Sequence, residues 1–179
     1  RNYILSDELG FGRKTINILK TKRKGLELSF SQKFGNLSLK ESYAYLKGKR
    51  EYNGKEGKFL SPNNYIDWTN TGLKKVPKHS LTLEANYQFS PIISGEIRYK
   101  YNGKYSNFSS LDQKEEEGYI KSHSVTDLSL HYHHENGLHL YGGINNLFNE
   151  KYFEYAGSRI YTVIPAEERT FFLGAKYKF

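Results

Sequence analysis

The stretch RTFFLGAKYKF, at residues 169–179, decides the fold. From Phe171 onward, large apolar or aromatic side chains occupy every second position apart from the small Ala175, and glycine and lysine alternate with them. A period of two residues is typical of a β-strand with one apolar and one polar face. A strand that ends on Phe179 beside Lys178 would be unusual at the edge of a soluble β-sandwich. The environment that its apolar face contacts, water or lipid, therefore has to be established.

The same alternation recurs along the chain. In HSLTLEANYQF at 79–89, leucine, alanine, tyrosine and phenylalanine alternate with serine, threonine, glutamate, asparagine and glutamine. Asn136-Gly137 is the strongest kind of short hairpin signal, and Glu41 interrupts the apolar side of one stretch. The stretches with this period are 26–34, 37–45, 79–89, 93–101, 124–134, 138–144 and 171–179. They predict seven full antiparallel strands, with a candidate partial strand at 2–9.

The composition excludes several classes of protein. The 16 Tyr, 11 Phe and 1 Trp make the chain 16% aromatic. No apolar run approaches the roughly 18 residues that a membrane helix needs, so a helical membrane protein is excluded. The alternating strands of a membrane β-barrel escape this test, because their lipid-facing residues are averaged with polar ones. Without Cys, neither a disulfide framework nor a thiolate zinc site can form.

The connections between the predicted strands alternate in length. Tight turns are expected near 35–36, 90–91 and 135–137, and long polar loops near 50–76, 105–122 and 153–167. This asymmetry is typical of outer-membrane barrels, so the turns are predicted to be periplasmic and the loops extracellular. The aromatic residues then form two girdles at the two membrane interfaces. A soluble β-sandwich with aromatic cross-strand pairs is the alternative, but it explains neither the loop asymmetry nor the girdles.

Two segments carry a family resemblance. GGINNLFNEKY at 142–152 follows a Gly-x-Asn-Asn-Leu-Phe-Asn-x-x-Tyr pattern, and IPAEERTFFLGAKYKF at 164–179 follows a Pro-x-x-x-Arg-Thr-Phe-x-x-Gly pattern ending in Tyr-x-Phe. Both are similar to the last two strands of TonB-dependent outer-membrane receptors, and KGLELSF at 24–30 and VPKHSLTLEANYQF at 76–89 agree. The matching residues of the two patterns are Gly143, Asn145, Asn146, Leu147, Phe148, Asn149, Tyr152, Pro165, Arg169, Thr170, Phe171, Gly174, Tyr177 and Phe179.

The resemblance implies that residues 1–179 form the C-terminal seven to eight strands of a larger, 22-stranded antiparallel transmembrane barrel with a plugged lumen. The N-terminal plug domain and the earlier strands are expected to be absent from this chain. Such receptors lie in the outer membrane of Gram-negative bacteria and import scarce nutrients; a ferric siderophore or haem is favoured here, with cobalamin as a further candidate. Strand counting also permits a small stand-alone eight-stranded outer-membrane barrel with an adhesive or structural role.

The same resemblance implies the partners. They are outer-membrane lipid and lipopolysaccharide, the receptor's own plug and remaining strands, the TonB complex acting through the plug, and the barrel-assembly machinery. Nucleic acid is not expected despite the net charge of +8, because no aromatic and basic platform or reading helix accompanies the charge. No cofactor is expected, although the transported ligand itself is expected to carry iron or haem.

Three groups of candidate site residues emerge. Residues of the long loops are expected to bind an anionic, partly aromatic ligand: Tyr65, Trp68, Tyr155, Arg159 and Tyr161. Basic residues of the extracellular rim are expected to face the phosphates of lipopolysaccharide: Lys20, Lys22, Lys24, Lys47, Lys49 and Arg50. Residues of the last strand resemble the signal that the barrel-assembly machinery reads: Phe171, Leu173, Tyr177 and Phe179. Interfacial anchoring of the aromatics and simple solvation of the rim charges remain open.

The histidines of HYHH and its neighbouring strand form a further candidate group. His131, His133 and His139 are predicted to point into the lumen near the periplasmic mouth. Imidazoles two residues apart on a strand share a face, as a metal site requires, but no Cys accompanies them. A polar lining that contacts the plug is therefore favoured over a metal site.

Enzymatic motifs are missing from the sequence. It contains no nucleophile elbow, no zinc-protease motif and no phosphate-binding loop. The predicted lumen carboxylates Glu84, Glu96 and Asp127 show no pairing that the sequence alone establishes. Catalysis is not expected.

Overall fold

A computed structural model describes residues 3–9, 12–52, 58–61, 64–67, 70–72, 76–106, 119–156 and 163–178, with side chains within 20–49, 76–105, 120–154 and 164–178. Every regular element among these residues is a β-strand. Within them we find no helical segment able to cross a bilayer. The strands are β1 (Tyr3–Leu9), β2 (Gly12–Phe34), β3 (Leu37–Tyr52), β4 (Lys58–Ser61), β5 (Asn64–Asp67), β6 (Asn70–Gly72), β7 (His79–Ser90), β8 (Ile93–Asn102), β9 (Tyr105–Ser106), β10 (Tyr119–Ile120), β11 (His123–His133), β12 (Leu138–Asn145), β13 (Phe153–Ala156), β14 (Val163–Pro165) and β15 (Thr170–Tyr177).

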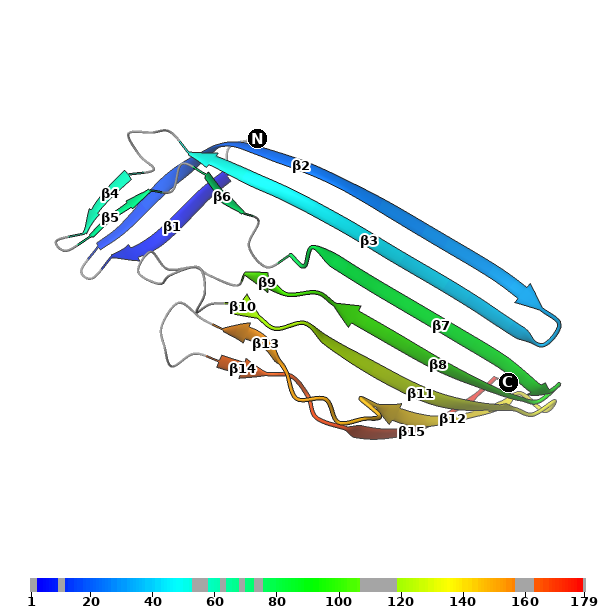
Figure 1. Ribbon diagram of the computed structural model, residues 1–179. Helices are drawn as coiled ribbons and strands as arrows, with labels where there is room; N and C mark the ends of the chain where they lie inside the picture. The colour runs from blue at the N-terminus through cyan, green and yellow to red at the C-terminus, as the bar shows by residue number, and fades with distance from the viewer. Residues whose placement is uncertain are drawn as a thin grey trace.

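Most strands form one antiparallel sheet in the order β1-β2-β3-β7-β8-β11-β12-β15, and β6 pairs with β3 (Figure 1). The two ends of this order are β1 and β15, and among the described residues these pair only with β2 and β12, respectively. The sheet is therefore a wall with two open edges. This agrees with a portion of a larger barrel, whereas a closed eight-stranded barrel would require its first and last strands to pair.

Tight turns join the long strands at one end of the sheet (Figure 1). Gly35 and Gly137 take positive φ angles of 55° and 90° in two of these turns, a conformation that glycine adopts at little cost. The third turn lies at Pro91 and Ile92, one residue beyond its predicted position. At the opposite end, the short hairpins β4–β5, β9–β10 and β13–β14 fall within the predicted long loops.

The strands β2 and β3 are longer than a bilayer requires. They contain 23 and 16 residues, whereas a tilted membrane strand needs about 9–11. The apolar series of β2 occupies 26–34, and the far part of this strand, 12–18, pairs with β1. The predicted partial strand at 2–9 is confirmed as β1. Alternation in the sequence does not reveal the strand over 12–23.

The register gives the sheet two different faces. Leu28 lies opposite Tyr43, and Tyr43 opposite Leu81, so the apolar series of neighbouring strands share one face. Its exposed large side chains include Leu26, Leu28, Phe30, Phe34, Leu83, Tyr87, Ile97, Leu130, Leu140, Phe171, Leu173 and Tyr177. Leu173 is 89% exposed, and among the described residues Ile120 is the one large apolar side chain that is buried. The apolar surface thus faces outward, as it does in lipid.

Glu41 lies on this outer face without any local irregularity of the strand. Its partners are Phe30 and Leu83, and the register is continuous through that part of β3. Leu83 is in turn opposite Tyr99. The carboxylate therefore lies on the outer face at the level of Phe30, in the middle of the apolar series 26–34 of β2.

Candidate functional site

The polar face of the sheet carries a row of alternating charges. Lys40, Glu84, Arg98 and Asp127 are successive cross-strand partners on β3, β7, β8 and β11, and we call them the charged row. Arg98 donates from Nε to Glu84 Oε1 at 2.9 Å and from Nη2 to Glu96 Oε1 at 2.8 Å. Lys40 Nζ lies 4.0 Å from Glu84 Oε2. The predicted lumen carboxylates therefore have cationic partners. Glu96 and Arg98 lie two residues apart on β8, whereas the pairs of Glu84 with Arg98 and with Lys40 depend on the register between strands.

Asp127 links the charged row to the end of β12. Its Oδ2 lies 3.9 Å from Lys100 Nζ, and its Oδ1 accepts a hydrogen bond of 3.0 Å from the backbone N–H of Asn146. Asn146 is 4% exposed and has a φ of 51°. This left-handed conformation is one that asparagine tolerates better than most residues.

Side chains of the segment 145–149, the Asn-rich turn, hold it in place. Asn146 Oδ1 accepts from the N–H of Glu150 at 2.8 Å, and its Nδ2 donates to the carbonyls of Glu150 at 2.9 Å and Glu167 at 3.3 Å. Asn149, with a φ of 55°, accepts from the N–H of Arg169 at 2.8 Å. The two asparagines thus tie the end of β12 to the segment leading into β15. These contacts explain the asparagines of the family pattern.

Two glycines of the same patterns lie beneath aromatic rings. Gly143 pairs with Phe172, and Gly174 with Tyr141, across β12 and β15. A Cβ on Gly143 would come within 2.7 Å of Phe172 Cζ, and one on Gly174 would overlap the ring of Tyr141. Each ring therefore covers the glycine opposite, an arrangement that protects the backbone of a strand lacking a side chain.

A stacked pair lies beside the Asn-rich turn and was not among the predicted site residues. The rings of His123 and Tyr152 have centroids 4.0 Å apart and planes inclined by 11°, and His123 is buried. Burial raises the pKa of Tyr152, and the carboxylate of Glu154 adds to the rise, so the phenol stays neutral. His123 begins its strand and Tyr152 lies outside one, so strand alternation carries no signal for either.

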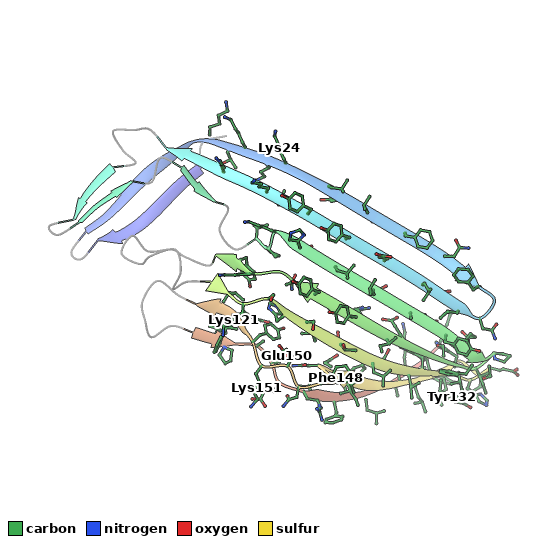
Figure 2. The ribbon with its side chains drawn as sticks, viewed as in Figure 1. Lys24, Lys121, Tyr132, Phe148, Glu150 and Lys151 are labelled. Atoms are coloured by element: carbon green, nitrogen blue, oxygen red, sulfur yellow. The ribbon has the colours of Figure 1, made fainter. Side chains whose placement is uncertain are left out.

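The basic residues predicted at the rim lie directly beyond the apolar part of β2 and β3. Lys24 is opposite Lys47, and Lys22 is opposite Lys49; all four are exposed, and we call them the lysine ladder. Figure 2 shows Lys24 on β2, away from the tight turns. The other two predicted rim residues, Lys20 and Arg50, are opposite Glu51 and Thr21.

The predicted ligand-binding residues are only partly placed. Tyr65 lies in β5 and Tyr155 in β13, two strands of the short hairpins beyond the sheet (Figure 1). Outside the described residues are Trp68, Arg159 and Tyr161, together with the side chains of Tyr65 and Tyr155. The ligand-binding role of this group stays a prediction.

The predicted assembly signal lies on the open edge of the sheet. Phe171, Leu173 and Tyr177 all belong to β15, share its outer face and are exposed. Phe179 lies outside the described residues. The position of these side chains on an edge strand is compatible with a segment that another protein recognises, and that role also stays a prediction.

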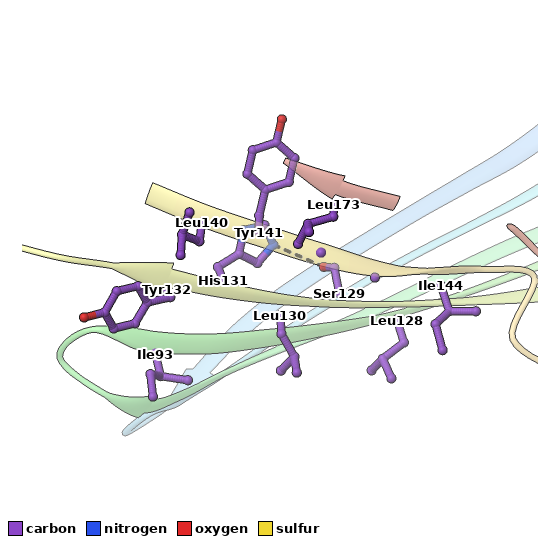
Figure 3. Close-up of a pocket in the computed structure, with 12 residues that line it drawn as sticks. Ile93, Leu128, Ser129, Leu130, His131, Tyr132, Leu140, Tyr141, Ile144 and Leu173 are labelled. Atoms are coloured by element: carbon purple, nitrogen blue, oxygen red, sulfur yellow. Dashed lines mark hydrogen bonds between the residues drawn. The ribbon is translucent and has the colours of Figure 1, made fainter. Parts of the chain in front are cut away.

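The three candidate histidines come together on the lumen face of the β11–β12 hairpin. His133 lies opposite His139, and Nδ1 of His131 is 3.2 Å from Nε2 of His139. One ring nitrogen from each histidine can be chosen so that all three lie within 4.8 Å of one another. Ser129 Oγ is 3.1 Å from His131 Nε2 (Figure 3). We call these three residues the histidine cluster.

The other side of the same hairpin carries an apolar groove of about 470 Å³. Leu128, Leu130, Ile144 and Leu173 line it, and Gly142 leaves room for it. In Figure 3, Leu128, Leu130 and Ile144 lie on the side of the hairpin opposite the Ser129–His131 hydrogen bond. The groove thus belongs to the outer face, where its lining suits a lipid acyl chain better than a polar cargo.

Comparison with known proteins agrees with this geometry. The family model "TonB dependent receptor-like, beta-barrel" matches residues 1–147. The siderophore receptor PiuA from Acinetobacter baumannii has a TM-score of 0.75 and 21% identity over 99% of this chain and 24% of its own. The FrpB iron transporter from Neisseria meningitidis gives 0.70 and 24% over 99% and 27%. The copper transporter OprC gives 0.74 and 18% over 99% and 26%. No curated protein sequence matches the chain.

The solved structures and the family model support different conclusions about this chain. Identities under 25% support the shared fold alone, and the chain spans about a quarter of the length of these solved proteins. The family model, in contrast, covers most of the chain, from β1 through β12. The chain belongs to the TonB-dependent receptor-like β-barrel family.

Proposed function

We propose that this chain forms the C-terminal part of the barrel wall of a Gram-negative outer-membrane receptor that takes up a scarce nutrient with energy from the TonB complex. The observation that carries the proposal is a single sheet with an apolar, exposed outer face and a charged inner face. Such a wall needs lipid on one side and a polar lumen on the other. The rest of the receptor would supply the plug and the strands that complete the two open edges.

A ferric siderophore or haem is the favoured cargo, with cobalamin as a further candidate. The siderophore receptor PiuA and the iron transporter FrpB support an iron-bearing cargo. OprC shares the fold and is a copper transporter, so the fold by itself does not select the cargo. On this chain, the proposed contacts to the cargo are Tyr65, Trp68, Tyr155, Arg159 and Tyr161, because aromatic rings and a guanidinium suit an anionic, partly aromatic molecule.

The charged row is the proposed docking surface for the plug. Glu84, Arg98 and Asp127 are only partly buried in this chain and Lys40 is exposed. The four residues offer donors and acceptors in alternation across four strands. A plug bound there would exclude water and strengthen each ion pair. The TonB complex would then act on the wall indirectly, through the plug.

The lysine ladder is proposed to bind lipopolysaccharide phosphates. Like charges directly opposite each other on two strands are destabilising, and the ladder contains two such pairs, Lys22 with Lys49 and Lys24 with Lys47. An anionic group between the ammonium groups would relieve this repulsion. The position of the ladder directly beyond the apolar series of β2 and β3 supports this proposal, because the polar headgroups of a leaflet begin where the acyl chains end.

Growth of a deletion strain tests the uptake function. A strain lacking the gene is expected to grow poorly when iron is offered only as a ferric siderophore or haem, and an excess of free iron salt is expected to restore growth. Uptake of radiolabelled cargo measures the defect directly. If the strain takes up iron chelates, haem and cobalamin as well as its parent does, the receptor proposal fails and a structural role in the membrane gains support.

A further inference from the structure

We propose that the histidine cluster binds a divalent transition-metal cation at the lumen face of the β11–β12 hairpin, close to its tight turn. The sequence alone favours a polar lining here, because no Cys accompanies the three histidines. The cross-strand register changes this balance, since it sets His139 directly opposite His133. The site is separate from the two proposed cargo contacts whose backbone the structure describes, Tyr65 and Tyr155, which lie in the short hairpins at the other end of the sheet.

The separations within the cluster suit a shared cation. Nδ1 of His131 and Nε2 of His139 are 3.2 Å apart, and two nitrogen ligands at about 2.0–2.1 Å from a tetrahedral zinc ion lie about 3.3 Å apart. The ring of His133 stacks on that of His139 with centroids at 4.0 Å and planes inclined by 12°. Ring nitrogens from all three fall within 4.8 Å of one another, so small side-chain rotations complete a three-nitrogen site.

Ser129 orients the first ligand. Its Oγ lies 3.1 Å from Nε2 of His131. When that Nε2 carries the proton and donates it to the hydroxyl, Nδ1 of His131 presents its lone pair toward His139. A hydrogen bond from the second ring nitrogen is the usual device that fixes the tautomer of a metal-binding histidine. Neutral imidazole is a preferred ligand of zinc, copper and nickel ions.

One neighbouring charge opposes the cation. Lys176 on β15 is the cross-strand partner of His139, and its ammonium group repels a positive ion on the same face. The metal affinity should therefore change in opposite directions when Lys176 and when a ligand is replaced, which a cluster that binds no metal would not show. Replacing Lys176 by Gln should tighten metal binding, whereas replacing a ligand should weaken it.

Zinc titration of the complete receptor, folded in detergent, tests the site. Isothermal titration calorimetry is expected to show a Zn²⁺ equivalent that disappears, or weakens at least about tenfold, in H131A, H133A and H139A. His134→Ala is the matched control, because this residue lies on the same hairpin outside the cluster, and it should leave the affinity unchanged. K176Q should raise the affinity several-fold.

Two further readouts keep the result independent of folding. A shift in gel mobility between unheated and boiled receptor confirms that each variant retains its barrel. Co²⁺ should give the visible absorption of a tetrahedral site in the parent, in H134A and in K176Q, but in none of the variants that lack a histidine of the cluster. Equal Zn²⁺ affinity of the parent and the H131A/H133A/H139A variant overturns the proposal and leaves a polar lining. Failure of the deletion strain to show an uptake defect would not affect this test.

Discussion

Asn146 shows how much structure one side chain of the family pattern holds. Its amide accepts one hydrogen bond and donates two, all to the backbone, and its own N–H is bound by Asp127. No repeated secondary structure would satisfy these groups, because the chain leaves the sheet at this point. The residue is therefore fixed both by its backbone angle and by its partners.

Replacing Asn146 by Ala should destabilise the folded receptor by about 2–4 kcal/mol, because buried backbone groups lose their partners and alanine is strained at a positive φ. Asn146→Gly should lose the same hydrogen bonds, but glycine adopts the positive φ without strain. The loss of stability should therefore be about 1 kcal/mol smaller than in Asn146→Ala. The midpoint of urea unfolding in lipid vesicles measures both. Asn145→Ala is the control, since this exposed side chain makes a single 3.2 Å hydrogen bond to Thr170; an equal loss in both alanine variants would contradict the argument.

Individual contacts of this kind could be predicted only in outline. The grouping of His131 and His133 follows from their spacing, whereas the approach of His139 depends on which residues of β12 face β11. The pairing of Glu84 with Arg98 likewise depends on register, which the hydrophobic pattern fixes only as inside or outside. Partners along the strand therefore come from the structure.

At the scale of elements, the strands that cross the membrane were predictable and their extensions were not. Residues 26–34 alternate because one face meets lipid and the other the lumen. Residues 12–23 of the same strand, β2, lie beyond the apolar series, where the requirement for one lipid-facing side, and with it the reason for alternation, ends. The same argument applies to the short hairpins β4–β5, β9–β10 and β13–β14, whose sequences read as polar loops.

Removing charge from the lysine ladder should raise the stability of the receptor without lipopolysaccharide and reduce the stabilisation that added lipopolysaccharide gives. The double variant K24Q/K47Q should be more stable than its parent in detergent without lipopolysaccharide, by about 0.2–1 kcal/mol, because one like-charge pair is removed. It should also gain less stability when lipopolysaccharide is added, and retain less of it on purification. Thermal unfolding with and without the lipid measures the first two effects.

A lumen-facing variant controls for the loss of charge alone. Lys40→Gln removes a lysine from the charged row, on the other face of the sheet, and should leave the response to lipopolysaccharide unchanged. If the ladder variant responds to the lipid as fully as the parent, the ladder is simply solvated.

On the scale of the whole molecule, the open edges at β1 and β15 determine what the chain can do alone. Unpaired backbone groups at a strand edge are not tolerated in lipid. Expressed without other receptor segments and refolded in detergent, the 179-residue chain should run at the same gel position boiled and unboiled. The complete receptor should show the shift of a folded barrel. A heat-sensitive shift of the isolated chain would instead favour the small stand-alone barrel.

From the sequence, the class of the whole molecule can be predicted more readily than whether its strands close into a barrel. Loop asymmetry and alternation lead to an outer-membrane barrel because each reflects the contrast between lipid and water, and the two terminal patterns add a family resemblance that implies the same class. Whether the first and last strands meet depends on partners that strand alternation does not encode. The strand order β1 to β15 supplies that information, and the position of β1 on the far part of β2 accounts for its short, polar sequence.

The length of β2 has an evolutionary consequence. Its residues 26–34 must keep lipid on one side and a lumen on the other, so most substitutions there carry a penalty that depends on the face. Its residues 12–25 extend about 45 Å along the strand beyond that zone, where no lipid-facing side is required. One continuous strand thus has two parts under different physical constraints: the membrane restricts substitutions in 26–34, and it does not restrict those in 12–25.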